Sequence, residues 1–307
     1  MSTHRQDLIS RCLVRPGKRL RLRDLDSRDV LVPEFTAIGT EALKKRARLL
    51  LEASRAELGK AQELLWASDA HSVLVVFQGM DAAGKDGMVK HVMSGMNPSA
   101  CEVHAFKEPS AEELTHNFLW RYWQRVPARG RIGIFNRSYY EDVLVARVHP
   151  ELLAAQRLPP ASASAGIWAR RYEDINALER HLARSGTVII KFFLNLSQPE
   201  QKSRLLERLD DPHKRWKFSP ADVAERAHWA EYMAAYQAML NATSTAWAPW
   251  YAIPADHKHV ARAVVASILC DRIGALGLKY PKVAKDPERE LVAARRLLLR
   301  RPAARRR

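Results

Sequence analysis

Apolar residues are distributed along the chain in two alternating patterns. Some form uninterrupted runs, which are typical of strands buried on both faces of a parallel sheet. Others recur every three or four positions among charged residues, which is typical of amphipathic helices. The runs predict strands at residues 73–77, 101–106, 131–135, 187–194 and 250–253. The spaced pattern predicts helices at residues 36–68, 86–96, 112–126, 167–185, 220–243 and 258–276. A further helix follows Ser197, which forms a capping box with Glu200.

Strands that alternate with helices predict βαβ units with right-handed connections. We therefore expect an α/β fold, with one three-layer α/β/α domain around a central parallel sheet of about five strands. The domain is predicted to span residues 35–280, after an extended N-terminal arm at 1–34. Residues 281–307 are predicted to be a basic tail, because the segment from Ala294 onward contains seven arginines and no acidic residue. Such a segment is typical of a solvated extension.

The strand at 73–77 leads into the loop GMDAAGK at residues 79–85, and a helical pattern follows. A glycine loop and a lysine between a strand and a helix bind phosphate, because backbone N–H groups and the helix N-terminus face the anion. Asp86 stands where a serine or threonine usually follows the lysine, and Asp81 lies inside the loop. We therefore predict a site where Asp81 and Asp86 bind Mg²⁺, or Mn²⁺, beside phosphate.

Two further loops are expected at the same edge of the sheet, because ligands of open parallel sheets bind beyond the carboxyl ends of the strands. The loop after residues 131–135 contributes Arg137, Glu141 and Asp142. The segment after residues 187–194 contributes five cations, namely Arg204, Arg208, Lys214, Arg215 and Lys217. We interpret residues of about 204–225 as a helical lid. A pocket with many cations, a few carboxylates and no obvious His or Cys nucleophile suits phosphoryl transfer.

Simpler explanations exist for several of these residues. Arg137 alone is compatible with a structural ion pair, and Arg204 and Arg208 with a solvated helix face. The eleven histidines show no ligand spacing, and the three widely spaced cysteines fit neither a zinc site nor a disulfide framework. The cysteine pattern favours a reducing, cytoplasmic location.

The formal charge of +16 requires a polyanionic partner or at least tolerance of one. Nucleic acid, anionic lipid and inorganic polyphosphate all satisfy this requirement. No run of about 18 apolar residues is present, so we expect no membrane span. The first residues lack the uninterrupted apolar core of a signal peptide.

Four segments together resemble the polyphosphate kinase 2 family: GMDAAGKDG at 79–87, FNRSYYEDVLVARVHP at 135–150, DDPHKRWKFSP at 210–220 and APWYAIPADHKHVAR at 248–262. The resemblance extends from about Arg15 to about Gly277 and covers most of the chain. It implies a thymidylate-kinase-like P-loop fold and magnesium-dependent transfer of phosphoryl groups between inorganic polyphosphate and nucleotides. It also implies a homodimer or homotetramer.

The resemblance assigns roles to individual residues. Asp81 matches a loop aspartate proposed to hold magnesium and to help activate the acceptor phosphate. Lys85 and Arg137 match the loop lysine and the arginine of the second motif. Asn136 departs from the family, because many members have aspartate there. Glu141 marks the subgroup often called class III, which accepts nucleoside mono- and diphosphates.

The candidate residues fall into two groups. The predicted catalytic residues are Asp81, Lys85, Arg137, Glu141 and Arg208. The predicted phosphate- and nucleotide-binding residues are Gly79, Met80, Ala82, Ala83, Gly84, Asp86, Gly87, Asn136, Arg204, Lys214 and Lys217.

Our leading hypothesis is a reversible, polyphosphate-dependent kinase that converts AMP to ADP and ADP to ATP. An ordinary ATP-dependent nucleotide kinase would share the fold, but Asp86 argues against it, because that position usually carries a magnesium-binding hydroxyl. A non-enzymatic nucleic-acid-binding protein is the third hypothesis. It rests on the charge and the tail alone, and the chain has no recognisable nucleic-acid-binding motif.

Overall fold

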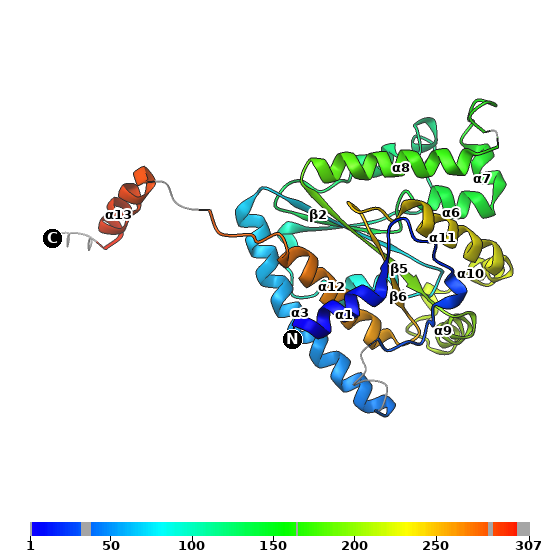
Figure 1. The fold of residues 1–307 in the computed structure, drawn as a ribbon, viewed down its shortest axis with the longest axis horizontal. Coiled ribbons are helices and arrows are strands. Elements are labelled where there is room, and N and C mark those ends of the chain that lie inside the picture. The colour runs from blue at the N-terminus through cyan, green and yellow to red at the C-terminus, as the bar shows by residue number, and fades with distance from the viewer. Residues whose placement is uncertain (1, 32–37, 164, 282–284, 300–307) are drawn as a thin grey trace, which may run out of the picture.

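The computed structural model describes residues 2–31, 38–163, 165–281 and 285–299 (Figure 1). Its centre is a six-stranded sheet in the order β1-β6-β5-β2-β4-β3. The strands are β1 (Leu13–Val14), β2 (Ser72–Gln78), β3 (Cys101–Ala105), β4 (Ile132–Asn136), β5 (Thr187–Asn195) and β6 (Trp250–Pro254). All neighbouring pairs are parallel except β1 with β6, which are antiparallel. The five predicted strands are confirmed.

Helices cover both faces of the sheet. The described α-helices are α1 (Ser2–Cys12), α3 (Thr40–Ser68), α4 (Lys85–Val92), α5 (Trp120–Trp123), α6 (Glu141–Val148), α7 (Pro150–Ala155), α8 (Ile167–Arg184), α9 (Gln198–Asp210), α10 (Pro220–Ala224), α11 (Trp229–Thr243), α12 (Lys258–Gly274) and α13 (Lys285–Leu299), of which α13 does not cover the sheet. Val73, Val75 and Phe77 join one core with α1, α3, α4 and α12. Leu74 and Val76 join the other core with α5, α6, α8 and α11. Because side chains alternate along β2, one strand serves both cores, and the predicted α/β/α architecture is confirmed.

The N-terminal segment differs from the extended arm predicted from the sequence. It begins with α1, whose Leu8 and Cys12 are buried in the core beside α12. It continues as β1, which pairs with the edge of β6 and adds the sixth strand. Backbone groups of Leu20 then exchange two hydrogen bonds with the side chain of Asn241, at 2.7 and 3.0 Å. The apolar residues of this segment are few and lie among many charged ones, so the sequence pattern did not indicate a helix.

Two predicted helices are interrupted. The segment 112–126 contains only a 3₁₀ turn at Glu113–Thr115 and the four-residue α5. Tyr122 is buried in the core and Phe118 and Leu119 pack against it, whereas Trp123 is exposed. The Asn117 side chain accepts a hydrogen bond from the Leu119 N–H between the two elements. The segment 220–243 is divided into α10 and α11 by a 3₁₀ turn at Glu225–His228. Helices α6 and α7 were not predicted.

The basic tail contains an unpredicted helix, α13. Its residues 289–299 are all exposed, and Figure 1 shows it apart from the three layers. The last eight residues of the predicted tail, 300–307, lie outside the described part of the chain. Among the described helices, none has both the length and the apolar character that crossing a bilayer requires.

A buried ion pair joins the centre of the sheet to the start of α6. Lys191 and Glu179 are fully buried and lie 2.6 Å apart. The hydroxyls of Tyr139 and Tyr140 each donate to Glu179 at 2.8 Å, and Lys191 also donates to Tyr140 and to the Thr243 carbonyl at 2.8 Å. Burial lowers the pKa of Lys191 to about 8. This network fixes the two tyrosines that lie between Arg137 and α6.

We expect Lys191→Met to reduce the free energy of unfolding by about 3–5 kcal/mol, because it leaves the Glu179 carboxylate buried without its cation. The double variant Lys191→Met/Glu179→Leu removes both charges and is expected to lose much less. Urea unfolding at neutral pH, followed by far-UV circular dichroism, measures both. A single variant as stable as the double variant would contradict the prediction.

Candidate active site

The phosphate loop lies between β2 and α4, where the sequence predicted it. Gly79 is required by close packing, because a Cβ there would lie 3.0 Å from the Leu194 carbonyl oxygen and 3.2 Å from the Ala83 Cβ. Gly84 precedes α4 with a φ of 106°, which only glycine adopts easily. Ala82 also has a positive φ, of 63°. The loop is therefore held in a specific shape at a cost in backbone strain, as is common at ligand-binding sites.

Arg204 holds this loop from behind. Its Nη1 donates to the carbonyls of Ala82 and Ala83, at 3.0 and 3.1 Å. Its Nη2 donates to the carbonyls of Ala255 and Asp256, and its Nε donates to Glu200 at 2.8 Å. All five N–H donors are thus committed, and the side chain is only 8% exposed. The structure therefore gives Arg204 a supporting role instead of the predicted phosphate contact.

The predicted capping box of α9 is only half formed, because Glu200 pairs with Arg204. The Ser197 hydroxyl accepts from the Glu200 N–H at 3.2 Å, as expected. The Glu200 carboxylate, however, pairs with Arg204 and leaves the Ser197 N–H to the Asp256 side chain, at 2.9 Å. The start of α9, the phosphate loop and the β6–α12 connection are therefore bound to each other.

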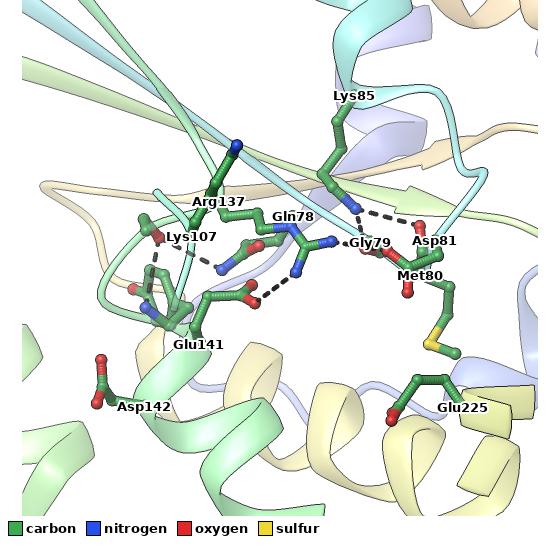
Figure 2. A network of polar contacts seen from close by, with 12 residues as sticks. Gln78, Gly79, Met80, Asp81, Lys85, Lys107, Arg137, Glu141, Asp142 and Glu225 are labelled. Atoms are coloured by element: carbon green, nitrogen blue, oxygen red, sulfur yellow. Dashed lines mark hydrogen bonds and ion pairs between the residues drawn. The ribbon is translucent and has the colours of Figure 1, made fainter. Parts of the chain in front are cut away.

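Lys85 points into the loop from the first turn of α4 (Figure 2). Its ammonium donates to the carbonyls of Gly79 and Met80, the latter at 3.2 Å. Burial, followed by the charge of the neighbouring Arg137, lowers the pKa of Lys85 to about 8. Lys85 thus occupies the place that the sequence predicted, with a cation enclosed by backbone oxygens.

Arg137 lies between two carboxylates in front of the loop. Its Nη2 is 2.7 Å from Asp81 and its Nη1 is 3.3 Å from Glu141 (Figure 2). Glu141, followed by Asp81, raises the pKa of Arg137. Arg137 has a φ of 66°, and its N–H donates to the Phe77 carbonyl at 3.1 Å. A strained backbone at the end of β4 thus directs the guanidinium toward the loop.

Of the two acids that follow Arg137, only Glu141 faces it. Figure 2 shows Asp142 turned away. Asp142 accepts hydrogen bonds from the Tyr122 hydroxyl at 3.2 Å and from Gln156 at 2.9 Å. Burial raises the pKa of Asp142 to about 6. Asp142 therefore supports the start of α6, and Glu141 is the acid that pairs with Arg137.

Asp81 and Asp86 contact different partners. Asp86 is exposed, accepts a hydrogen bond from Asn136 at 2.8 Å and lies 3.9 Å from Lys217. Asp81 faces Arg137. Among the described residues, no group of three His, Cys, Asp or Glu side chains is arranged to hold a metal ion. Magnesium is commonly held by one or two carboxylates together with substrate phosphates and water, so the Asp81 carboxylate fits such a site.

The predicted lid extends over α9, the 3₁₀ turn at Arg215–Lys217 and α10. Arg208 pairs with Asp222 of α10 at 2.9 Å. Burial, followed by the negative charge of Asp81, raises the pKa of Asp222. Lys217 reaches Asp86, whereas Lys214 pairs with Glu207 and Asp211, at 2.7 and 3.0 Å.

Several polar residues of the site were missed. Gln78, at the end of β2, is buried, and its Oε1 has no hydrogen-bond partner within the described structure. Lys107 is exposed just after β3, where the preceding N–H of Phe106 donates to Asn136 at 3.2 Å. Extending the carboxyl-end rule to the strand at 101–106 would have found Lys107. No sequence pattern marked Asp222 and Glu225 as site residues, because only the folding of the lid brings them near the loop.

Comparisons with known proteins show the family to which this chain belongs. A family model described as polyphosphate kinase 2 matches residues 41–279. The chain is 48% identical over 258 residues to an ADP-polyphosphate phosphotransferase of Rhodopseudomonas palustris, covering 84% of this chain and 89% of that one. It is 42% identical over 279 residues to an AMP/ADP-polyphosphate phosphotransferase of Meiothermus ruber, covering 91% and 98%. The crystal structure of a polyphosphate kinase 2 from Arthrobacter aurescens TC1 superposes with a TM-score of 0.80 at 42% identity, over 92% and 95% of the two chains. This chain therefore belongs to the polyphosphate kinase 2 family.

Proposed function

We propose that this protein transfers phosphoryl groups from inorganic polyphosphate to nucleoside mono- and diphosphates, converting AMP to ADP and ADP to ATP in a reversible reaction. The observation that carries the proposal is Arg137, held between Asp81 and Glu141 in front of the phosphate loop. The names of the relatives from Rhodopseudomonas palustris and Meiothermus ruber support polyphosphate as donor and ADP, or AMP and ADP, as acceptor. We assign the activity to residues 35–280.

Phosphoryl transfer requires alignment and neutralisation of charge more than covalent chemistry by the protein. In our proposal the backbone N–H groups of residues 79–84 and the Lys85 ammonium bind the donor phosphates. Arg137 contacts the transferring group from the side of the acceptor. Arg208 would leave Asp222 and contact the transferring group when phosphate binds. Lys217 would leave Asp86 for phosphate in the same way. The lid then excludes water, which would otherwise hydrolyse the donor.

Magnesium is the proposed cofactor, with manganese as a possible substitute. The Asp81 carboxylate would hold the ion, and Asp86 would influence it from the edge of the loop. The bound ion would neutralise charge on the phosphoryl oxygens. Asp81 also places its charge where it can orient the acceptor phosphate, and Arg137 keeps this carboxylate in position at 2.7 Å.

The protein is proposed to act in the cytoplasm as a homodimer or homotetramer. The absence of a cysteine framework in the sequence supports the location, and the family resemblance supports the assembly. Size-exclusion chromatography with light scattering measures the assembly directly. A monomer at micromolar concentration would contradict it.

The function is tested with purified protein, AMP or ADP, long-chain polyphosphate and magnesium, without added ATP. Formation of ADP and ATP is measured by a coupled assay, with GDP in parallel to determine base preference. Nucleotide phosphorylation that requires ATP and ignores polyphosphate would identify the alternative, an ATP-dependent kinase. Binding to DNA without any phosphoryl transfer would favour a nucleic-acid-binding protein.

Glu141→Asn is expected to reduce AMP phosphorylation more than ADP phosphorylation, by about tenfold in the ratio of kcat/KM values. AMP is held by a single phosphate, so its alignment depends more on the Arg137 guanidinium that Glu141 orients. ADP brings a second phosphate to the same cations. Steady-state kinetics with both acceptors measure the ratio, with Glu173→Asn on the exposed face of α8 as the control. Equal losses on both acceptors would remove the basis for placing this chain in the AMP/ADP subgroup.

A further inference from the structure

Strand β3 forms one end of the sheet, and among the described strands it pairs only with β4. The N–H of Phe106, just after β3, donates to the Asn136 carbonyl at the end of β4, at 3.2 Å. Because the backbone groups of successive residues in a strand point to opposite sides, Val103 directs its N–H and carbonyl away from β4. Neither group has a hydrogen-bond partner within the described part of the chain. The sheet therefore ends in an open edge.

This open edge lacks most of the features that normally prevent an edge strand from pairing with another chain. Proteins protect such edges with prolines, bulges, lysines or a covering loop. Strand β3 has the sequence CEVHA, and it pairs with β4 in an unbroken register over its whole length. Val103, at its centre, is 48% exposed. Apolar surface and free backbone groups are thus presented together, which is the arrangement that accepts a further strand.

The side chains of β3 are complementary to those of a second copy of the same strand. Two copies related by a two-fold axis must pair antiparallel, because the same surface meets itself. With Val103 on the axis, the two Val103 residues exchange both of their backbone hydrogen bonds. Glu102 then lies opposite His104 of the second copy, and this pair occurs twice. No like charges face each other in this register.

Glu102 and His104 are incompletely partnered within one chain. Nε2 of His104 is buried and has no hydrogen-bond partner among the described residues. The Glu102 carboxylate lies 3.6 Å from this nitrogen and 3.5 Å from Nη1 of Arg131, and it accepts no hydrogen bond from any residue that the structure describes. A buried nitrogen without a partner is unfavourable. Directly opposite residues of an antiparallel pair have Cβ atoms about 5 Å apart, so Glu102 of the second copy can supply the missing acceptor.

Exposed tryptophans lie near both ends of β3. Trp66 of α3 is 47% exposed and lines a hollow together with Asn97, which begins the turn leading into β3. At the other end, Phe106 packs on Tyr122 with ring centroids 4.5 Å apart, and the next residue, Trp123, is 48% exposed. A pair of short strands alone is smaller than a stable interface, so a second copy must also cover neighbouring surface. Large exposed aromatic side chains are typical of such surface.

We propose that the open edge of β3 is a contact between two copies of this chain, in which antiparallel β3 strands join the two sheets across a two-fold axis at Val103. The inference rests on the homo-oligomer proposed above and identifies the surface that forms it. Besides the bonds between the two Val103 residues, each Ala105 N–H reaches the Cys101 carbonyl of the other copy. The Cys101 N–H stays with the Pro98 carbonyl of its own chain. A strand of an unrelated protein would gain the backbone bonds, but nothing would place an acid opposite His104.

The first test compares Val103→Pro with Val103→Thr by size-exclusion chromatography with light scattering over a series of concentrations. Proline removes the N–H that points to the open edge but no hydrogen bond to β4, so the monomer keeps its fold. We expect the Kd for self-association to rise by about 100-fold or more, because two backbone bonds are lost and the neighbouring ones are displaced. Val103→Thr keeps the N–H and the β-branched shape, and it should assemble as wild type does.

Charge variants test the register. Glu102→Lys places a cation opposite His104 of the second copy, and it should raise the Kd for self-association about tenfold, since the pair occurs twice. Glu102→Gln can still accept a hydrogen bond from Nε2 of His104 and should weaken the association less. Equal effects of the two substitutions would overturn this register.

Cross-linking locates the contact without a measurement of affinity. The two Cα atoms of a hydrogen-bonded antiparallel pair are about 5.5 Å apart, which is within the range of a disulfide. Under mild oxidation Val103→Cys should therefore form a covalent dimer on a non-reducing gel. Val223→Cys, which replaces a lid valine that is 51% exposed, is the matched control. This control and wild type, with its natural cysteines, should both remain uncross-linked.

An oligomeric wild type whose assembly is unchanged by Val103→Pro would overturn the β3 contact, and so would equal cross-linking at positions 103 and 223. In either case the assembly forms through another surface. A monomeric wild type would overturn the proposed assembly together with the contact. The coupled assay decides the phosphotransferase activity separately, so failure of the contact is distinguishable from failure of the proposed function.

Discussion

Lys85→Ala is expected to lower kcat by about 1000-fold, the size of effect seen when one preorganised donor to a transition-state oxyanion is removed. In the structure the Lys85 ammonium is buried inside the loop, where its charge is little screened by water. Among the described residues, no other side chain donates to the carbonyls of Gly79 and Met80, and the only other donor to Met80 is the Ala83 N–H at 3.1 Å. The coupled assay at saturating polyphosphate and nucleotide measures the loss in kcat.

The protonation of Lys85 gives a second, independent expectation. Because burial lowers the pKa of Lys85 to about 8, the ammonium loses its proton as the pH rises through that value. The kcat/KM of wild type, which reports on the free enzyme, should therefore fall on the alkaline side of about pH 8. Lys85→Arg keeps its charge at these pH values and should lack this alkaline fall. Near-full activity of a folded Lys85→Ala protein would contradict the assigned role.

Asp81→Asn is expected to cause a comparable loss of about 1000-fold in kcat/KM. The substitution preserves the size of the side chain, but the neutral amide is a poorer ligand for magnesium and a weaker partner for Arg137. Arg137 would then keep only Glu141, at 3.3 Å, as its carboxylate. The loss should be partly offset by higher magnesium concentration if it arises from weakened metal binding. Kinetics across a magnesium titration measure both effects.

Asp86→Asn is the matched control for Asp81→Asn. The same chemical change is made five residues away, on a side chain that is 73% exposed and turned toward Asn136 and Lys217. We expect a loss of about tenfold or less, because such an exposed ion pair contributes little. Equal losses of activity at the two positions would support the prediction from the sequence that Asp81 and Asp86 both bind the metal. A folded and fully active Asp81→Asn protein would instead remove Asp81 from the mechanism.

The sequence predicted those parts of the molecule that are determined locally. The loop after 73–77 was recognisable because a buried strand, two glycines and a lysine occur at fixed spacing. The side of the sheet on which the three loops meet followed from the parallel strands alone. The serine cap of α9 was equally local. The loop and the cap each depend on residues within a few positions of one another.

The parts that could not be predicted depend on contacts between distant segments. Whether Glu141 or Asp142 faces Arg137 is decided by how α6 starts, and the buried network at Lys191 fixes that start. The sequence predicted that Arg204 is solvated or binds phosphate. Its hydrogen bonds to the loop depend on how the loop folds against α9. Strand β1 pairs with a strand more than two hundred residues away, and two residues carry too little periodicity to reveal it.

The attachment of Arg204 to the phosphate loop has a consequence for engineering this chain. Four hydrogen bonds from Arg204 join α9 to the loop and to the β6–α12 connection, so this part of the lid belongs to the static frame. Any hinge must lie further along, beyond Arg208. Insertions or exchanges within residues 211–219 should therefore alter the reach of the lid without disturbing the loop. That segment is where donor and acceptor preferences can be reshaped independently of the catalytic frame.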